Sequence, residues 1–168
     1  MKLFAAILMT ALLLCGCGAE ETLETVADEL VVPVMAQPKK ISVSLPGEAA
    51  MPAVESDSGR IYVCRDYEIV IQTYPAGDLD GTIEELSGCS RDALTVMGTQ
   101  QDGACRYDFV WASAGEGGDQ LGRAVILDDG DYHYTMVVTR PADTTETSQV
   151  TWSQVFGSFA LEMSDDPY

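Results

Sequence analysis

Four strand-like segments joined by short, turn-rich connections fill most of the second half of the sequence, and this pattern restricts the fold more than any other feature. The segments are rich in β-branched and aromatic residues, which favour strands, and they cover residues 94–99, 106–112, 123–127 and 132–139. The connections contain turn formers: Asp102-Gly103, Gly115-Glu116-Gly117-Gly118 and Asp128-Asp129-Gly130-Asp131. Parallel neighbours need a crossover of about a dozen residues or more, so these short connections predict an antiparallel meander.

The sequence predicts additional strands in the first half of the domain. Residues 41–45 alternate apolar and polar side chains and stop at Pro46-Gly47, which indicates a short half-buried strand followed by a turn. The next residues, through Gly59, contain turn formers without a clear period and predict a loop. Residues 61–64 and 67–73 then predict two strands joined by a tight turn at Arg65-Asp66, or one long strand with a bulge there.

Two amphipathic segments predict helices. In the first, residues 79–87, either Asp78 or Asp80 can cap the amino end and Gly88 suits the carboxyl end. Its apolar stripe is Leu79, Ile83 and Leu86. The second follows Pro141 and a Thr-rich stretch, with Thr147 or Ser148 as the cap, and its stripe is stronger: Trp152, Val155, Phe156 and Phe159.

These elements together predict an α+β domain. The expected architecture is an antiparallel sheet of about five to seven strands with two helices, of which the last is C-terminal and amphipathic. Strand positions opposite the aromatic residues are also partly apolar, which favours helices on both sheet faces; examples are Val110, Ile126 and Val137.

The amino-terminal residues have the layout of an export signal. Lys2 precedes an apolar run, residues 3–14, that is too short to span a bilayer. The run ends in the lipobox Leu14-Cys15-Gly16-Cys17, which resembles that of bacterial lipoproteins. This resemblance implies cleavage before Cys17, attachment of a diacylglycerol to the Cys17 thiol, and a lipid-anchored location in the cell envelope, on the outer, extracytoplasmic face of the membrane.

The chain therefore divides into four predicted regions. These are a signal peptide (residues 1–16), an acidic tether (17–40), a single α+β domain (41–163) and a frayed tail (164–168). Within the tether, residues 24–32 can alternatively form a short helix that docks on the domain.

The net charge is strongly negative, at −18 for the whole sequence and about −19 once the signal and its Lys2 are removed. Nucleic acid and anionic lipid surfaces both attract clusters of Lys and Arg, so this charge argues against both as direct partners. It is consistent with a solvated acidic surface, or with a surface that attracts cations or a basic partner.

The cysteine count limits the covalent chemistry of the domain. Three cysteines, Cys64, Cys89 and Cys105, follow the lipobox, so at most one intramolecular disulfide can form, and three pairings are open. The sequence contains no C-x-x-C pair of the kind that binds zinc, so core thiols or a single disulfide are favoured over a metal site. We expect no cofactor.

The order of elements and the last segments of the domain carry a second resemblance. Thr139-Arg140-Pro141 ends the last meander strand, and an acidic linker leads to a closing helix that ends in Ser158-Phe159-Ala160-Leu161. This arrangement, from about residue 41 to 161, resembles the PsbP-like group, which includes photosynthetic extrinsic subunits and bacterial envelope lipoproteins. The resemblance implies a role in binding or assembly rather than catalysis. It concerns the pattern of elements, so no functional residues transfer.

Three features invite a functional hypothesis. His133 is the only histidine and lies on the strand face opposite Tyr132 and Tyr134; without a G-x-S-x-G motif, a packed or surface histidine is favoured over a catalytic one. The Asp128-Asp129-Gly130-Asp131 segment favours a hairpin turn over a calcium site, because the EF-hand spacing is missing. Gly115-Glu116-Gly117-Gly118-Asp119 is too acidic for a phosphate loop, and predicts an exposed hairpin loop that can face a partner.

Taken together, these features predict a membrane-anchored extracytoplasmic lipoprotein with a non-catalytic binding or accessory domain. The predicted partners are the membrane, through the lipid anchor, and an extracytoplasmic protein or small ligand, but not nucleic acid. Two alternatives remain open: a small hydrolase that uses His133 with a nearby serine and aspartate, and a cation-binding acidic surface domain.

Overall fold

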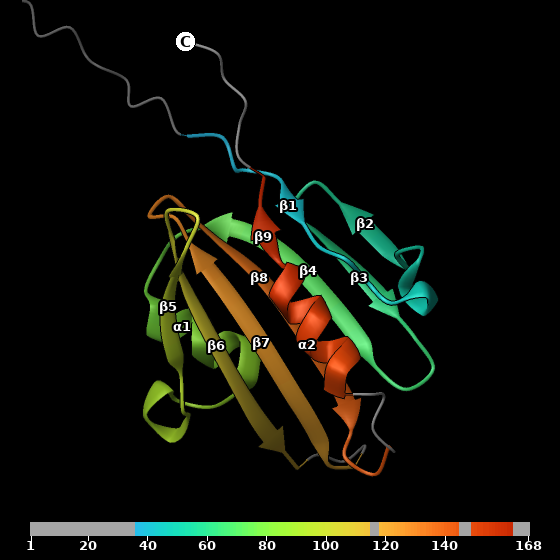
Figure 1. Ribbon diagram of the computed structural model, residues 1–168. Coiled ribbons are helices and arrows are strands. Elements are labelled where there is room, and N and C mark those ends of the chain that lie inside the picture. Colours follow the sequence, from blue (N-terminus) through green and yellow to red (C-terminus); the bar gives the residue numbers. More distant parts are fainter. Residues whose placement is uncertain (1–35, 115–117, 145–148, 163–168) are drawn as a thin grey trace, which may run out of the picture. The chain divides into compact units, whose positions relative to one another are not determined.

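A computed structural model describes residues 36–114, 118–144 and 149–162, which belong to one compact unit. Within these ranges, a seven-stranded antiparallel sheet has the order β2-β3-β4-β8-β7-β6-β5, and a two-stranded sheet pairs β1 with β9 (Figure 1). Two α-helices accompany the sheets, so the predicted α+β class is confirmed.

The strand bounds are β1 (Ile41–Ser42), β2 (Val54–Ser56), β3 (Gly59–Val63), β4 (Glu68–Pro75), β5 (Met97–Gln101), β6 (Ala104–Ser113), β7 (Gln120–Asp128), β8 (Tyr132–Pro141) and β9 (Ala160–Leu161). The strands β5 to β8 form the predicted meander. Its tight turns use left-handed backbone at Asp102 (φ 50°), Gly103 (φ 81°) and Gly130 (φ 95°), as the Asp-Gly sequences require.

Helix α1 (Leu79–Ser87) has the bounds that its capping signals predict. The Asp78 side chain accepts a hydrogen bond from the Gly81 amide at 3.2 Å, and Gly88 (φ 70°) donates its amide to the Glu84 carbonyl at 2.8 Å. Ile83 is fully buried, and packs in a cluster with the alternate residues of the meander that face α1: Phe109, Trp111, Ala124, Ile126 and Val137.

Helix α2 (Gln149–Ser158) packs on the opposite face of the sheet, which Figure 1 shows with α2 in front and α1 behind. Its stripe residues Val155 and Phe156, and Phe159 just beyond the helix, are buried against the other set of alternate strand residues, including Ile69, Ile71, Val125, Leu127, Met136 and Val138. Period-two alternation therefore produces two hydrophobic cores, one on each side of the same strands. The expectation of helices on both faces is confirmed.

The structure differs from the predictions in the first third of the domain. The predicted loop before Gly59 contains the 3₁₀ helix η1 (Gly47–Ala49) and strand β2, which pairs with β3. All three residues of β2 are exposed, so no alternation marked it as a strand. The predicted strand 41–45 contributes only β1 as paired strand, and Arg65-Asp66 forms a tight turn, with the Cys64 amide bonded to the Tyr67 carbonyl at 2.9 Å.

Two boundaries later in the chain also differ. Strand β5 begins at Met97 rather than Leu94, because the 3₁₀ helix η2 (Arg91–Ala93) precedes it and Leu94 packs partly buried beside α1. After Phe159 the chain turns into β9, which pairs with β1 through Ile41 opposite Leu161. This pairing joins the first and last strands of the domain.

The residues just before β1 contact the turn between β7 and β8. Lys39 donates its amide to the Tyr134 hydroxyl at 2.9 Å and forms an ion pair with Asp129 at 2.9 Å. The Tyr132 hydroxyl donates to the Ala36 carbonyl at 2.9 Å. Residues 36–40, which the sequence assigned to the tether, are thus held against the domain.

Several predicted features lie outside the described residues: the signal peptide 1–16, residues 17–35 of the tether, the candidate caps Thr147 and Ser148, and the tail 164–168. In the part of the chain that the structure describes, neither helix has the length and apolar character needed to cross a membrane.

Candidate functional site

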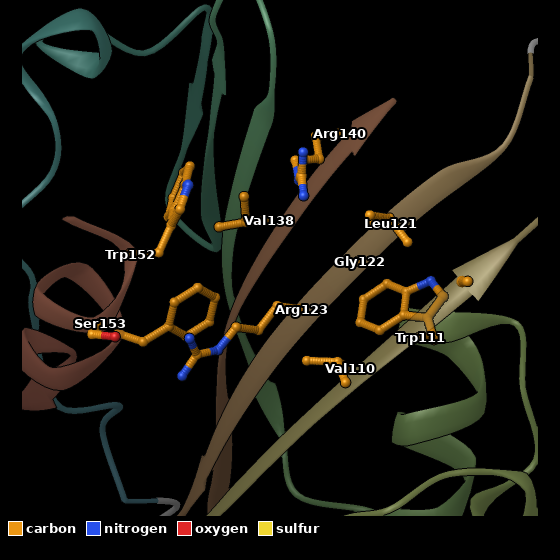
Figure 2. A pocket seen from close by; sticks show the side chains of 11 residues that line it. Val110, Trp111, Leu121, Gly122, Arg123, Val138, Arg140, Trp152 and Ser153 are labelled. Atoms are coloured by element: carbon orange, nitrogen blue, oxygen red, sulfur yellow. The ribbon is translucent and has the colours of Figure 1, made fainter. Parts of the chain in front are cut away.

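An open groove of about 680 Å³ lies on the α2 face of the sheet, between the first turns of α2 and the adjoining parts of β6, β7 and β8 (Figure 2). One wall is the helix, with Trp152, Ser153 and Phe156. The sheet side is made by residues of three neighbouring strands: Val110, Trp111 and Ala112 of β6; Leu121, Gly122 and Arg123 of β7; and Val138 and Arg140 of β8.

The groove exists because α2 lies toward the β4 side of the sheet (Figure 1). Trp152, near the start of α2, packs edge-on to Tyr67, just before β4, with 4.9 Å between the ring centres. Residues of β6 and β7 on the same face are therefore left partly uncovered: Val110, Leu121 and Arg123.

Strand register decides which side chains line the groove. In the antiparallel pairs, Val110 lies opposite Arg123, Arg123 opposite Val138, and Leu121 opposite Arg140, so these residues share one face. Val110 is 61% exposed, which is unusual for a valine in an interior strand and marks the open side of the groove. Trp111 and Gly122 alternate onto the opposite face of the sheet. They border the groove only where β6 and β7 lie side by side.

Arg123 is the central charged residue of the groove. Its guanidinium carbon lies 4.0 Å from the centre of the Phe156 ring, a cation–π contact. The nearest carboxylate among the described residues is Asp108, whose Oδ1 is 3.9 Å from Arg123 Nη2, beyond hydrogen-bond distance. Burial lowers the pKa of Arg123; the negative charge of Asp108 opposes this shift and the positive charge of Arg106 adds to it.

Arg140 supplies the second positive charge. Its Nη1 donates a hydrogen bond to the Thr144 carbonyl at 2.6 Å, which holds the side chain beside the end of β8. Because Leu121 is opposite Arg140 and Arg123 is two residues further along β7, the two arginines are diagonal neighbours, a relation that typically separates residues by about 7–8 Å.

Beside the groove, Arg106 forms a buried network that fixes the carboxyl end of α2. Its guanidinium binds both oxygens of Asp108, at 2.6 and 3.1 Å, and donates to the carbonyls of Phe156 and Phe159 at 2.9 and 3.3 Å. The side chains of Arg106 and Asp108 are only 11% and 15% exposed. The sequence analysis missed this pair; the available signal was an Arg-x-Asp spacing that places both charges on one strand face, beneath an amphipathic helix.

His133 lies on the other side of the sheet, under α1, with 1% of its surface exposed. Its Nδ1 is 2.9 Å from the Thr82 hydroxyl, and its Nε2 is 3.8 Å from the Asp128 carboxylate. This order of hydroxyl, imidazole and carboxylate resembles that of a nucleophilic site, but Thr82 is itself only 7% exposed. The nearest hollow, beside Tyr74 and Glu85, is lined by neither Thr82 nor His133. The geometry gives a substrate no access to this hydroxyl.

Tyr74 packs edge-on to His133, with 6.1 Å between the ring centres, and extends this buried polar cluster. Its hydroxyl is buried without a hydrogen-bond partner among the described residues. Burial and the nearby Glu85 raise the pKa of Tyr74, so the phenol stays neutral.

The acidic segment between β7 and β8 is a hairpin turn in which the carboxylates of Asp128 and Asp129 accept hydrogen bonds from within the domain. Asp129 accepts hydrogen bonds from the amides of Asp131 and Tyr132 and from the Tyr134 hydroxyl, in addition to its ion pair with Lys39. Burial raises the pKa of Asp129, but these hydrogen bonds outweigh burial and hold the pKa below its usual value. Within the described ranges, no three acidic, histidine or cysteine side chains are grouped to hold a metal ion.

The three domain cysteines are free thiols in the structure. Cys64 packs beside the core under α2, whereas Cys89 packs beside the core under α1. The Cys105 sulfur accepts a hydrogen bond from the Gln100 side chain at 3.0 Å.

The predicted partner-facing loop connects β6 to β7 and is described only in part. Gly115, Glu116 and Gly117 lie outside the described residues. Gly118 (φ 102°) and Asp119 are exposed, and the Asp119 carbonyl accepts a hydrogen bond from the Ala142 amide at 2.8 Å. Ala112 and Leu121, on the strands that flank the loop, both line the groove, so the described end of the loop adjoins it.

Neither a protein-family model nor a curated protein sequence matches this chain. Among solved structures, the chain is similar to a crystal structure, at 1.50 Å resolution, of a protein from Bacteroides thetaiotaomicron VPI-5482, with a TM-score of 0.51 and 11% sequence identity. The match covers 76% of this chain and 47% of the Bacteroides chain, so this chain spans about half the length of the structure that it matches. At this identity the likeness shows the fold alone. The lipoprotein and PsbP-like resemblances stay predictions.

Proposed function

We propose that this protein is a lipid-anchored, extracytoplasmic lipoprotein whose domain is a non-catalytic binding module, and that the groove beside α2 is its binding site. The single observation that carries the proposal is the composition of the groove. Its described lining residues include two arginines, two tryptophans and several aliphatic side chains but no acidic residue, in a chain of net charge −18.

The size and form of the groove support this assignment. Small-molecule sites typically enclose about 300–1,000 Å³ and combine a mostly apolar lining with a few placed polar groups. A groove of about 680 Å³ with Arg123, Arg140 and Ser153 among apolar walls has these properties. The walls come from one helix and three strands of a continuous sheet, so the site is held by regular secondary structure.

Binding is tested by placing a photo-crosslinking amino acid at Val110, which lines the groove and is 61% exposed. The matched control is Val63, which is 64% exposed on β3 and outside the groove. Irradiation of intact cells should give a crosslinked product of defined mass from position 110 and none from position 63. Equal crosslinking at both positions, or none at either, would refute the groove as the binding site.

The anchor is supported by the lipobox that ends at Cys17 and is tested separately. A clickable fatty acid fed to cells should label the wild-type protein, and the labelled protein should co-fractionate with membranes. The Cys17→Ser variant should lose the label and leave the membrane fraction. A variant that keeps both would show that Cys17 is not the lipidation site.

A further inference from the structure

We propose that the groove recognises a small monocarboxylate with an apolar body, whose carboxylate binds Arg123 and whose body lies against Trp152, Leu121 and Val110. This inference rests on the proposed function and names the ligand class for the same site. Four features of the groove carry it: the state of Arg123, the charge of its surroundings, the shape of the lining and the charge of the whole molecule.

Arg123 is pre-positioned to bind a planar anion. The guanidinium carbon lies 4.0 Å from the centre of the Phe156 ring, and this contact restrains the charged end of the side chain. Within the described part of the chain, Arg123 donates no hydrogen bond and approaches a carboxylate only at 3.9 Å. A carboxylate offers two oxygens with the spacing that a guanidinium edge binds in a bidentate manner.

The neighbouring carboxylate does not cancel this positive charge. Asp108 is bound through both oxygens by Arg106, so that pair is close to neutral as a unit. Arg123 therefore remains as a net positive charge, and its side chain is 37% exposed toward the groove. Burial lowers the pKa of this guanidinium, and a bound anion would restore the stabilisation that water no longer provides.

The rest of the lining suits an apolar body. Aliphatic and aromatic groups surround the arginine on both walls: Val110, Ala112, Leu121, Val138, Trp152 and Phe156. Burying such a body removes apolar surface from water, which favours binding. Arg140, diagonal to Arg123 on the next strand, adds positive potential at the end of the groove.

The net charge of the chain restricts how much negative charge the ligand can carry. A protein of net charge −18 repels polyanions at long range, and this repulsion grows with each added negative charge on the ligand. A single carboxylate gains the local contact with Arg123 at the smallest long-range cost. Polyphosphates and nucleic acids are disfavoured by the same comparison.

The experiment is a fluorescence titration of the full chain with decanoate, below its micelle concentration. Tryptophan occurs at two positions of the sequence. Trp152 forms part of the helix wall of the groove and reports its occupancy, whereas the Trp111 indole is buried in the core under α1 and should contribute a constant background. Decanol is the matched neutral probe and decyl phosphate the more highly charged one. We expect decanoate to bind at least tenfold more tightly than either.

The variant Arg123→Met keeps a long apolar side chain but removes the charge. It should weaken decanoate by about 10- to 100-fold and leave decanol unchanged, because only the charged contact is lost. Arg60→Met is the control: Arg60 is exposed on β3 and pairs with Glu55 outside the groove, so decanoate affinity should not change. Near-ultraviolet circular dichroism of each variant checks that the domain stays folded.

Two outcomes would overturn the ligand class: equal affinities for decanoate and decanol, or a folded Arg123→Met variant with unchanged decanoate affinity. If decanoate fails but a product still crosslinks at position 110, the groove is a binding site for another chemistry. If both experiments fail, the proposed function fails with the inference.

Discussion

Replacing Arg106 by methionine should destabilise the domain severely, because one side chain connects three parts of the fold. Its guanidinium neutralises Asp108 and donates to carbonyls at the carboxyl end of α2. Methionine fills a similar volume without charge. The substitution therefore removes the interactions while leaving the packing nearly unchanged.

The expected loss of stability is about 3–5 kcal/mol, the usual cost of removing one partner from a buried ion pair. Asp108, 15% exposed, is left with only the 3.9 Å contact to Arg123, and the Phe156 carbonyl keeps only the longer hydrogen bond from the Phe159 amide, at 3.4 Å. For a domain of this size, each kcal/mol lowers Tm by about 3–4 °C, so Tm should fall by about 10–20 °C.

Urea unfolding, followed by tryptophan fluorescence and circular dichroism, measures this loss. Arg60→Met is the control, because the Arg60–Glu55 pair is 3.5 Å apart and exposed on both sides, and should contribute less than about 1 kcal/mol. The double variant Arg106→Met with Asp108→Leu should recover part of the loss, since it leaves no charge unpaired. If Arg106→Met costs no more than Arg60→Met, the reasoning about this network is refuted.

Three further predictions concern other parts of the fold. Asp129→Asn should lower the free energy of unfolding by about 1–3 kcal/mol at pH 7. Because the folded state lowers the pKa of Asp129, the stability advantage of the wild type is complete above about pH 5 and shrinks as pH falls below about 4. Urea unfolding at pH 7 and pH 3 tests this, and an equal difference at both pH values would contradict it. Gly122→Ala should cost about 1–3 kcal/mol, since the added Cβ would overlap the indole of Trp111, whereas Gly77→Ala, where no atom lies within 4 Å, should be nearly neutral; equal Tm values for both variants would show that the indole moves freely. His133→Ala should lower stability by about 2–4 kcal/mol by leaving a cavity and an unpaired Thr82, yet should not alter decanoate affinity, because His133 lies on the opposite face; a folded variant with changed affinity would contradict this separation.

Local signals predicted the parts of the fold that local interactions determine. Helix α1 begins and ends where Asp78 and Gly88 place it, since capping depends on residues within one turn. The meander followed from turn sequences for the same reason. The short strand β2 could not be predicted, because none of its three side chains is buried and it is held mainly by backbone pairing with β3.

The end of α2 shows a different limit. The helical apolar period continues through Phe159, and the neighbouring residues do not indicate that the helix ends there and a strand follows. Strand β9 depends on pairing with β1, whose residues lie more than a hundred positions earlier in the sequence. Contacts between such distant segments leave no periodic signal in either one.

The groove also could not be predicted from the sequence. It results from the position of α2 toward the β4 side of the sheet, and from a register that brings Arg123, Val110 and Arg140 onto one face. One clue was present: Arg123 occupies the same alternation as Val125 and Leu127, where a buried strand residue is expected. A charged residue at a strand position that should be buried indicates either a buried ion pair or the edge of the sheet area that a helix covers. Arg123 lies next to both: the Arg106–Asp108 pair and the part of the sheet that α2 leaves open.

The contacts of Ala36 and Lys39 with the β7–β8 turn give the domain a polarity. The chain enters at the Tyr132 end of β8, while Arg140 and the groove lie at the other end, about 26 Å away along the strand (Figure 1). The described chain therefore enters the domain at one end of β8, and the proposed binding groove lies at the other end. A ligand in the groove would leave the contacts of Ala36 and Lys39 undisturbed.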